Sequence, residues 1–203
     1  MQRINEPDEL QLEFRDRFPE LVLASSSPNR KKLLEIAGIN VRIFVPGINE
    51  EKVGRTNEEK ILNIAKQKIE CYAESSEFNH SIPAIAADTL VLFKNDLIGK
   101  PADRNEAERI LTELRGRHHE VLTAVGLYLP EKGISIFLDK SYVVFRDFSD
   151  NEIEEYLNRG EWKGAAGGYR LQATGYELVE RIDGDWTNVV GLPLKRILDE
   201  SLS

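Results

Sequence analysis

The stretch that most constrains the fold is residues 21–38, LVLASSSPNRKKLLEIAG. The apolar run Leu21–Ala24 predicts a strand, and a serine-rich turn joins it to an amphipathic helix. Ser27 suits the N-cap of that helix, Pro28 its first position, and Gly38 the left-handed residue that closes it. A strand that leads directly into a helix is typical of α/β proteins.

The first turn of this helix carries three cations, Arg30, Lys31 and Lys32. Each costs roughly 0.3–1 kcal/mol at the positive end of a bare helix dipole, whereas a bound anion would reverse that sign. The pattern therefore indicates a phosphate site. Solvated lysines on an exposed turn are the more ordinary interpretation of Lys31 and Lys32. Arg30 differs because it shares the buried helical stripe of Leu33 and Leu34, where a guanidinium needs an anionic partner.

Strand and helix patterns alternate in the first half of the chain, and a hairpin pattern follows. Strands are predicted at Val41–Val45, Ile82–Ala87, Leu90–Phe93, Glu120–Leu129 and Ile134–Phe145. The last two are joined by a short turn with proline and glycine, which predicts an antiparallel hairpin. This order predicts an α/β fold with a mixed, twisted sheet flanked by helices, not a uniformly parallel doubly wound sheet.

Length and charge narrow the classes of protein. A chain of 203 residues suits one domain, which we place at residues 19–203 after a polar N-terminal extension, 1–18, helical from Pro7. The net charge of −8 argues against a nucleic-acid partner, although local cations and a divalent metal can still hold a triphosphate. No apolar run reaches about 18 residues and no signal-peptide core is present, so we expect no membrane partner and a cytoplasmic location.

Two charged side chains lie next to predicted core. Asp88 directly follows the apolar run Ile85–Ala87, and the carboxyl end of a buried strand is where α/β proteins place reactive groups. A turn aspartate is the alternative. On the helix that begins after Thr56, Lys68 falls within the apolar stripe and Lys66 lies off it. A lysine stem that snorkels along the apolar face is the alternative for Lys68.

Other residues give weaker signals. Lys100 stands before Pro101, whose ring restricts the lysine backbone, but Gly-Lys-Pro also occurs in ordinary turns. Gln172 follows a glycine-rich run, and its amide offers both a donor and an acceptor, which suits a base edge. The three histidines have no metal-ligand spacing. A single cysteine and no nucleophile elbow give little support to covalent catalysis.

Six motifs then occur in order along residues 21–198: LASSSPNRKKLLEIAGI (23–39), AADTLV (86–91), GKP (99–101), LRGRHHEVLTAV (114–125), AAGGYRLQ (165–172) and IDGDWTNVVGLPL (182–194). Together they resemble the signatures of the Maf family of nucleoside triphosphate pyrophosphatases. The resemblance implies two lobes around a central cleft, similar in outline to the inosine triphosphate pyrophosphatases. The implied reaction cleaves a nucleoside triphosphate between its α- and β-phosphates, giving the monophosphate and pyrophosphate.

The resemblance also implies the roles of individual residues. Asp88 would be the catalytic base, and Asp88 with Glu50 would hold a divalent cation, Mg²⁺ or Mn²⁺. Only the resemblance distinguishes Glu50 from neighbouring surface glutamates. The remaining residues would contact the substrate, at its polyphosphate through Arg30, Lys68, Lys100 and the N–H groups around Ser27, and at its base through Asn29, Thr89 and Gln172. The family resemblance further implies a homodimer.

Two positions suggest a subgroup. Family members that act on dTTP and UTP resemble this chain in having a threonine at Thr89 and a glutamine at Gln172, whereas those that act on 7-methyl-GTP tend to have glutamine and glutamate. A glutamine pairs with a pyrimidine edge as donor and acceptor, while a carboxylate only accepts. The chain departs from the pyrimidine subgroup at Asn29, Ala165 and Ala173, where that subgroup usually has arginine, lysine and glycine.

We therefore expect an enzyme that hydrolyses dTTP and UTP, or modified pyrimidine triphosphates, and keeps non-standard nucleotides out of nucleic acids. Three alternatives remain. The first is a 7-methyl-GTP pyrophosphatase, and the second is a phosphatase of different regiochemistry. The third is a non-catalytic nucleotide-binding regulator of septation, because the family is also linked to arrest of cell division.

Overall fold

The computed structural model describes residues 7–49 and 53–203. Its strands are β1 (Glu20–Ala24), β2 (Asn40–Phe44), β3 (Ala84–Phe93), β4 (Asp96–Ile98), β5 (His118–Leu129), β6 (Gly133–Phe145) and β7 (Val179–Asp183). Its helices are α1 (Glu9–Arg17), α2 (Pro28–Ile36), α3 (Asn57–Ala73), α4 (Arg104–Leu114), α5 (Asp150–Asn158), the short η1 (Ala166–Gly168) and η2 (Thr174–Leu178), α6 (Trp186–Val190) and α7 (Leu194–Leu202).

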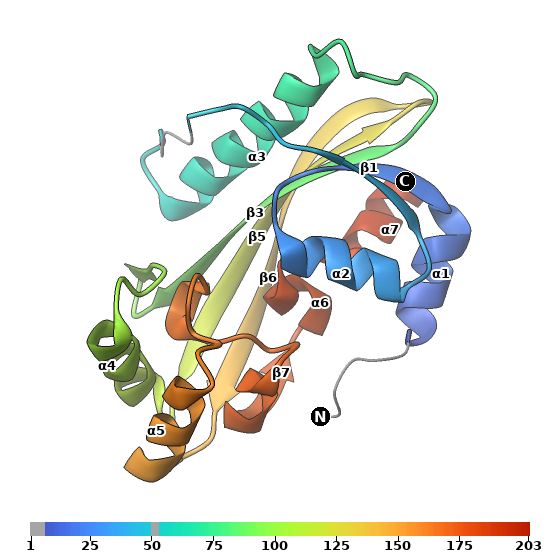
Figure 1. Cartoon of the computed structure of the whole chain (residues 1–203). Coiled ribbons are helices and arrows are strands. Elements are labelled where there is room, and N and C mark those ends of the chain that lie inside the picture. The colour runs from blue at the N-terminus through green and yellow to red at the C-terminus, as the bar shows by residue number, and fades with distance from the viewer. Residues whose placement is uncertain (1–6, 50–52) are drawn as a thin grey trace. The chain divides into compact units, whose positions relative to one another are not determined.

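Within the described residues the strands form one seven-stranded sheet in the order β2-β1-β3-β5-β6-β7, with β4 paired to β3 (Figure 1). Strand β1 runs parallel to β2 and β3, whereas β4 and β7 pair antiparallel to their neighbours. The predicted mixed sheet with flanking helices is therefore confirmed. No helix in the described ranges has both the length and the apolarity to cross a membrane.

The chain divides into two compact units. Among the described residues, unit 1 comprises 90–122 and 140–190, and unit 2 comprises 7–49, 53–89, 123–139 and 191–203. Strands β3, β5 and β6 each begin in one unit and end in the other.

In unit 2 the core follows from the alternation of side chains along β1. Leu21 and Leu23 point to one face of the sheet and Val22 and Ala24 to the other, and all four are buried. Val22 and Ala24 belong to a cluster that includes Ile69 and Tyr72 of α3. Figure 1 shows α3 on one side of these strands and α2 on the other. A strand covered on both faces explains its uninterrupted apolar sequence.

Gly126 of β5 lets α3 come close to the sheet. A Cβ on this residue would lie 2.7 Å from Ile69 Cγ2 and 3.0 Å from the carbonyl oxygen of Ala65, both on α3. Contacts this short do not occur with a real side chain. The absence of a side chain at residue 126 therefore sets the spacing between α3 and β5.

Residues 9–17, which we expected as part of a polar extension, form α1 and pack onto unit 2. Phe14 and Phe18 are fully buried, Gln11 Nε2 donates to the carbonyl of Leu33 at 3.2 Å, and Arg17 Nε donates to Ser201 Oγ at 3.2 Å. The expected helix after Pro7 is present. The domain boundary at residue 18 stays a prediction, but part of the segment before it belongs to the hydrophobic core.

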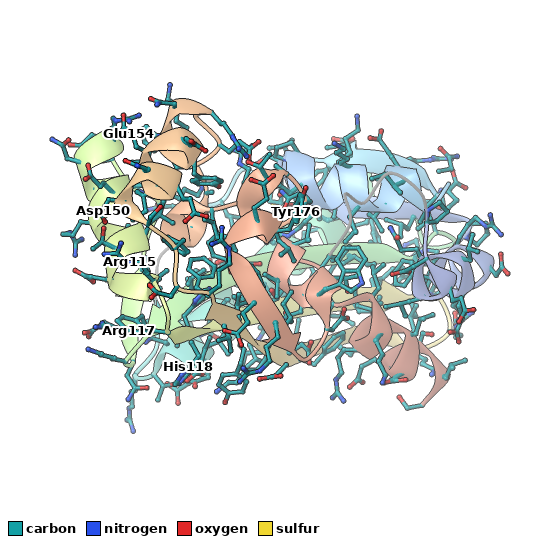
Figure 2. All side chains as sticks on the ribbon, turned by 90° about the horizontal axis from the view of Figure 1, so that it is seen from below. Arg115, Arg117, His118, Asp150, Glu154 and Tyr176 are labelled. Carbon is teal, nitrogen blue, oxygen red and sulfur yellow. The ribbon has the colours of Figure 1, made fainter. Side chains whose placement is uncertain are left out.

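Unit 1 is held by packing between α4 and α5 and by their ends. The apolar stripe of α4 is buried: Ala107, Ile110, Leu111 and Leu114. Arg115, which follows α4, donates from Nη1 to Asp150 at the start of α5 at 2.6 Å, and both are labelled in Figure 2. The same nitrogen donates to the carbonyl of Phe148 at 3.1 Å. These contacts fix the start of α5 relative to the end of α4.

Candidate functional site

Strand β3 carries two adjacent polar side chains, Asp88 and Thr89, within unit 2. Every residue of the strand is buried except these two, which are half-buried. Because neighbours on a strand point to opposite faces, Asp88 shares the face of Ala86, in the cluster with α3, and Thr89 points to the opposite face. These two adjacent residues thus place one polar side chain on each face of the sheet.

The position of Asp88 differs from our expectation. The sequence predicted a strand that ends before Asp88, whereas β3 continues from Ala84 to Phe93 and places Asp88 at mid-strand. Strand β1 pairs with β3 at Val22↔Ala84 and Leu23↔Ile85, while β3 goes on to pair with β4 from residue 91. Pairing at its far end keeps the segment extended despite the low strand propensity of aspartate.

Lys68 forms an ion pair with Asp88. The distance from Nζ to Oδ1 is 2.9 Å, and the two side chains are only 7% and 18% exposed. Nζ also lies 3.5 Å from the carbonyl oxygen of Ala87. Lys66, two residues earlier, is half-exposed and pairs with Glu70 at 3.7 Å. The predicted helical register, with Lys68 on the buried stripe and Lys66 off it, is confirmed.

Arg30 lies at the N-terminus of α2, where Ser27 is the N-cap and Pro28 the first residue, as predicted. Its guanidinium is buried and donates to three neutral oxygens. The acceptors are the carbonyl of Gly191 (from Nε, 2.7 Å), Ser25 Oγ (from Nη1, 3.0 Å) and Thr89 Oγ1 (from Nη2, 3.0 Å). Three fixed donors set the plane of the guanidinium. The buried stripe was predicted correctly, but these three partners were not.

The neighbouring cations behave as surface residues. Lys31 is exposed and pairs with Glu35 at 3.1 Å one helical turn on, and Lys32 is exposed. The ordinary interpretation of these two lysines is therefore supported. Asn29 is half-buried in the first turn of α2, on the same helix end as Arg30.

Sequence reasoning missed Ser25, Thr123 and Gly191. Thr123 is fully buried on β5, and its Oγ1 lies 3.0 Å from Thr89 Oγ1. Ser25 Oγ accepts from Arg30 and also from the backbone N–H of Ser27 at 3.2 Å. A hydroxyl between the apolar Leu122 and Ala124 was a usable signal for Thr123. No local pattern marks the carbonyl of Gly191.

Lys100 and Gln172 belong to unit 1. Their motifs meet through the backbone, because the N–H of Gly167 donates to the carbonyl of Gly99 at 3.1 Å. Gln172 is half-buried and Lys100 is exposed. The N–H of Arg170 donates to the hydroxyl of Tyr156 at 3.1 Å, which ties the glycine-rich segment to α5.

A buried histidine also fixes this segment of unit 1. His119 Nε2 lies 2.8 Å from the hydroxyl of Tyr169, and both side chains are buried. Burial, helped by the neighbouring charge of His118, lowers the pKa of His119 to about 3. Burial raises the pKa of Tyr169 well above its usual range. Both side chains are therefore neutral near pH 7.

The metal site expected at Asp88 and Glu50 is only half visible, because Glu50 lies outside the described residues. Within residues 7–49 and 53–203 no group of three or more His, Cys, Asp or Glu side chains could hold a metal ion. Asp88 alone still supplies a half-buried carboxylate. Mg²⁺ is commonly held by one or two carboxylates with water and substrate phosphate oxygens, so Asp88 suits this kind of site.

Unit 2 thus brings together six of the predicted site residues: Ser27, Asn29, Arg30, Lys68, Asp88 and Thr89. Lys68 contacts Asp88 on one face of β3, and Arg30, at the N-terminus of α2, contacts Thr89 on the other. Buried cations and a helix N-terminus suit phosphate groups, and a carboxylate suits a water molecule that attacks one. Fold and site define an α/β protein of the kind that binds phosphorylated ligands.

Residues 20–201 match the family described as Maf-like protein, and the chain belongs to that family. It is 40% identical over 181 residues to the dTTP/UTP pyrophosphatase of Dictyoglomus thermophilum, with 88% of this chain and 92% of the relative covered. It is 39% identical over 182 residues to the dTTP/UTP pyrophosphatase of Geobacillus sp. strain WCH70, with 89% and 96% covered.

Solved structures give a more distant likeness. The Ham1 protein of Staphylococcus aureus matches with a TM-score of 0.40 and 16% identity, over 63% of this chain and 72% of that one. A nucleoside-triphosphatase, or dITP/XTP pyrophosphatase, of Mycobacterium abscessus matches with a TM-score of 0.38 and 15% identity, over 62% and 74%.

Proposed function

We propose that this protein is a nucleoside triphosphate pyrophosphatase that hydrolyses dTTP and UTP to the monophosphate and pyrophosphate. The observation that carries the proposal is similarity over about nine-tenths of the chain to relatives named dTTP/UTP pyrophosphatase. The Lys68–Asp88 pair supports it, because the ammonium of Lys68 on α3 lies 2.9 Å from the carboxylate of Asp88 in the AADTLV segment.

Asp88 is the residue we assign to the attacking water. Its carboxylate would orient the water and take its proton, which general-base catalysis requires within hydrogen-bond reach. Lys68 would contact the phosphate under attack and neutralise its developing charge. In the structure Lys68 holds the Asp88 carboxylate from the α3 side, so the same lysine would link the base to the phosphate.

The other proposed contacts divide between the two ends of the substrate. Arg30, Lys100 and the N–H groups at the start of α2, after Ser27, would hold the polyphosphate. Thr89 and Gln172 would read the base, together with Asn29. Gln172 is half-buried, and its amide can both donate to and accept from a pyrimidine edge.

A divalent cation, Mg²⁺ or Mn²⁺, is part of the proposal. Asp88 and Glu50 would hold it, and when bound it would neutralise phosphate charge. The homodimer and the cytoplasmic location also stay predictions. Sedimentation of the purified chain measures the first, and fractionation of cells measures the second.

The test is a substrate panel with full product identification. Purified protein is incubated with dTTP, UTP, 7-methyl-GTP and other canonical triphosphates, with Mg²⁺, with Mn²⁺ and with EDTA, and the products are separated by chromatography. We expect dTTP and UTP to give the monophosphate and pyrophosphate. We expect no product to form in the presence of EDTA. Diphosphate and phosphate as products, a preference for 7-methyl-GTP, or binding without turnover would each reject the proposal in favour of one of the alternatives.

A further inference from the structure

Thr123 has no role in the proposed function so far, yet it touches the site. It is fully buried on β5 and its hydroxyl lies 3.0 Å from that of Thr89. A buried hydroxyl on an apolar strand needs a hydrogen-bond partner, since its desolvation is otherwise unfavourable. The hydroxyl of Thr89 is one such partner, and the contact joins β5 to β3.

The contact continues from Thr89 to Arg30. Nη2 of Arg30 donates to Thr89 Oγ1 at 3.0 Å, and because a guanidinium only donates, Thr89 must accept there. Thr89 Oγ1 is therefore held from two sides, by Arg30 and by Thr123. Two contacts on one oxygen select a single χ1 rotamer for a β-branched side chain, which is stiff at this torsion.

The surroundings leave little freedom for adjustment. A Cβ on Gly191 would lie only 3.1 Å from Thr89 Oγ1 and 3.4 Å from Arg30 Nε, so the backbone at residue 191 closes this side of the contact. The carbonyl of the same residue holds Arg30 Nε at 2.7 Å. Rotation of Thr89 would therefore withdraw the acceptor of Nη2 while Nε stays fixed.

We propose that Thr123 is a positioning residue for substrate binding: through Thr89 it fixes the direction in which Arg30 presents its guanidinium to the polyphosphate. The inference rests on the proposed function, because it takes Arg30 as a polyphosphate ligand. Thr123 itself does not touch the substrate. Its effect is on the affinity for the phosphate chain and not on the chemical step at Asp88.

The perturbation is Thr123→Val, which keeps the branched shape and removes the hydroxyl, with Thr123→Ser as the matched variant that keeps the hydroxyl. One lost neutral hydrogen bond corresponds to roughly a two- to tenfold change in an equilibrium constant. We expect Thr123→Val to raise the Kd for inorganic tripolyphosphate and the KM for dTTP by about that factor, with kcat within about twofold of wild type. Thr123→Ser is expected to restore both.

A double-mutant cycle separates positioning from general stability. Thr89→Val is made alone and together with Thr123→Val, and tripolyphosphate binding is measured by calorimetry for all four proteins. If Thr123 acts through Thr89, its replacement adds no further loss in the Thr89→Val background. The inference is overturned if Thr123→Val lowers the affinity for tripolyphosphate equally in both backgrounds, or does not lower it in the wild-type background. It is also overturned if Thr123→Ser does not restore the affinity.

The two proposals fail in different ways. If wild type releases no pyrophosphate from any triphosphate, the proposed function is rejected, and the tripolyphosphate cycle still reports on Thr123. If wild type hydrolyses dTTP but the cycle shows independent effects, only the role of Thr123 is rejected. If wild type does not bind tripolyphosphate, the inference about Arg30 and Thr123 is overturned regardless of turnover.

Discussion

Replacing His119 by glutamine is expected to reduce the stability that the protein loses between about pH 7.5 and about pH 5 by about 2 kcal/mol. His119 is only 1% exposed, and burial lowers its pKa to about 3 from the ordinary value of 6.5. The folded state therefore keeps His119 neutral, while the unfolded chain binds a proton as the pH falls through 6.5. This histidine's contribution to stability is complete above that pH and is lost as the pH falls towards the folded-state pKa.

The size follows from the two pKa values. A shift of one pKa unit corresponds to about 1.4 kcal/mol. Between about pH 7.5 and about pH 5 the unfolded histidine becomes almost fully protonated and the folded one does not, which gives a loss of about 2 kcal/mol in the free energy of unfolding. Tyr169, which faces His119 across the hydrogen bond, stays neutral over this range because its pKa is raised.

The measurement is urea unfolding followed by circular dichroism at several pH values. Between about pH 7.5 and about pH 5, the free energy of unfolding is expected to fall by about 2 kcal/mol more in wild type than in His119→Gln. This difference does not depend on how stable the two proteins are at neutral pH. His118→Gln is the control, since His118 is exposed (Figure 2), and it should lose stability as wild type does. The reasoning is refuted if wild type and His119→Gln lose stability in parallel.

Three further predictions concern activity. Asp88→Asn should lower turnover by about 10²-fold or more with an unchanged circular dichroism spectrum, and wild-type turnover in a pyrophosphate-release assay would exclude Asp88 as the base. Lys68→Ala should reduce kcat/KM by about 10- to 100-fold, whereas Lys66→Ala on the exposed side of the same helix should stay within about twofold; equal effects in steady-state kinetics would contradict the assignment. Asn29→Arg should strengthen the binding of dTTP and UTP relative to that of 7-methyl-GTP by about tenfold or more. An unchanged order of affinities in competition assays would reject the base-binding role of Asn29.

Local features of the fold were predictable because they depend on neighbours in the sequence. The cap at Ser27, the left-handed Gly38 with φ of 81° and the buried stripe containing Lys68 each follow from residues within a few positions. The buried position of Arg30 followed from the same periodicity. Much of the candidate site lies on these elements, so its residues in unit 2 could be predicted from the sequence.

The partners of those residues were not predictable in the same way. Arg30 meets the carbonyl of Gly191, 161 positions away, and Thr89 meets Thr123, 34 positions away. Such contacts depend on which strands pair and in which register, and no periodicity encodes them. The sequence predicts a strand end before Asp88 because the apolar run Ile85–Ala87 stops there. Pairing with β4 further along keeps β3 extended through Asp88.

Because Gly126 has no side chain, the candidate site is sensitive to a substitution at a residue to which no substrate contact is assigned. Any larger residue there would push α3 outward by about 1 Å, since a carbon–carbon contact needs at least about 3.5 Å and only 2.7 Å is available to Ile69 Cγ2. Lys68 moves with that helix, so its ammonium would be carried away from Asp88. A displacement of about 1 Å at a reacting group costs about 10²-fold in rate. Gly126→Ala would therefore look in a screen like a mutation of the candidate site, although Gly126 is not among the residues proposed to contact the nucleotide or to act on water.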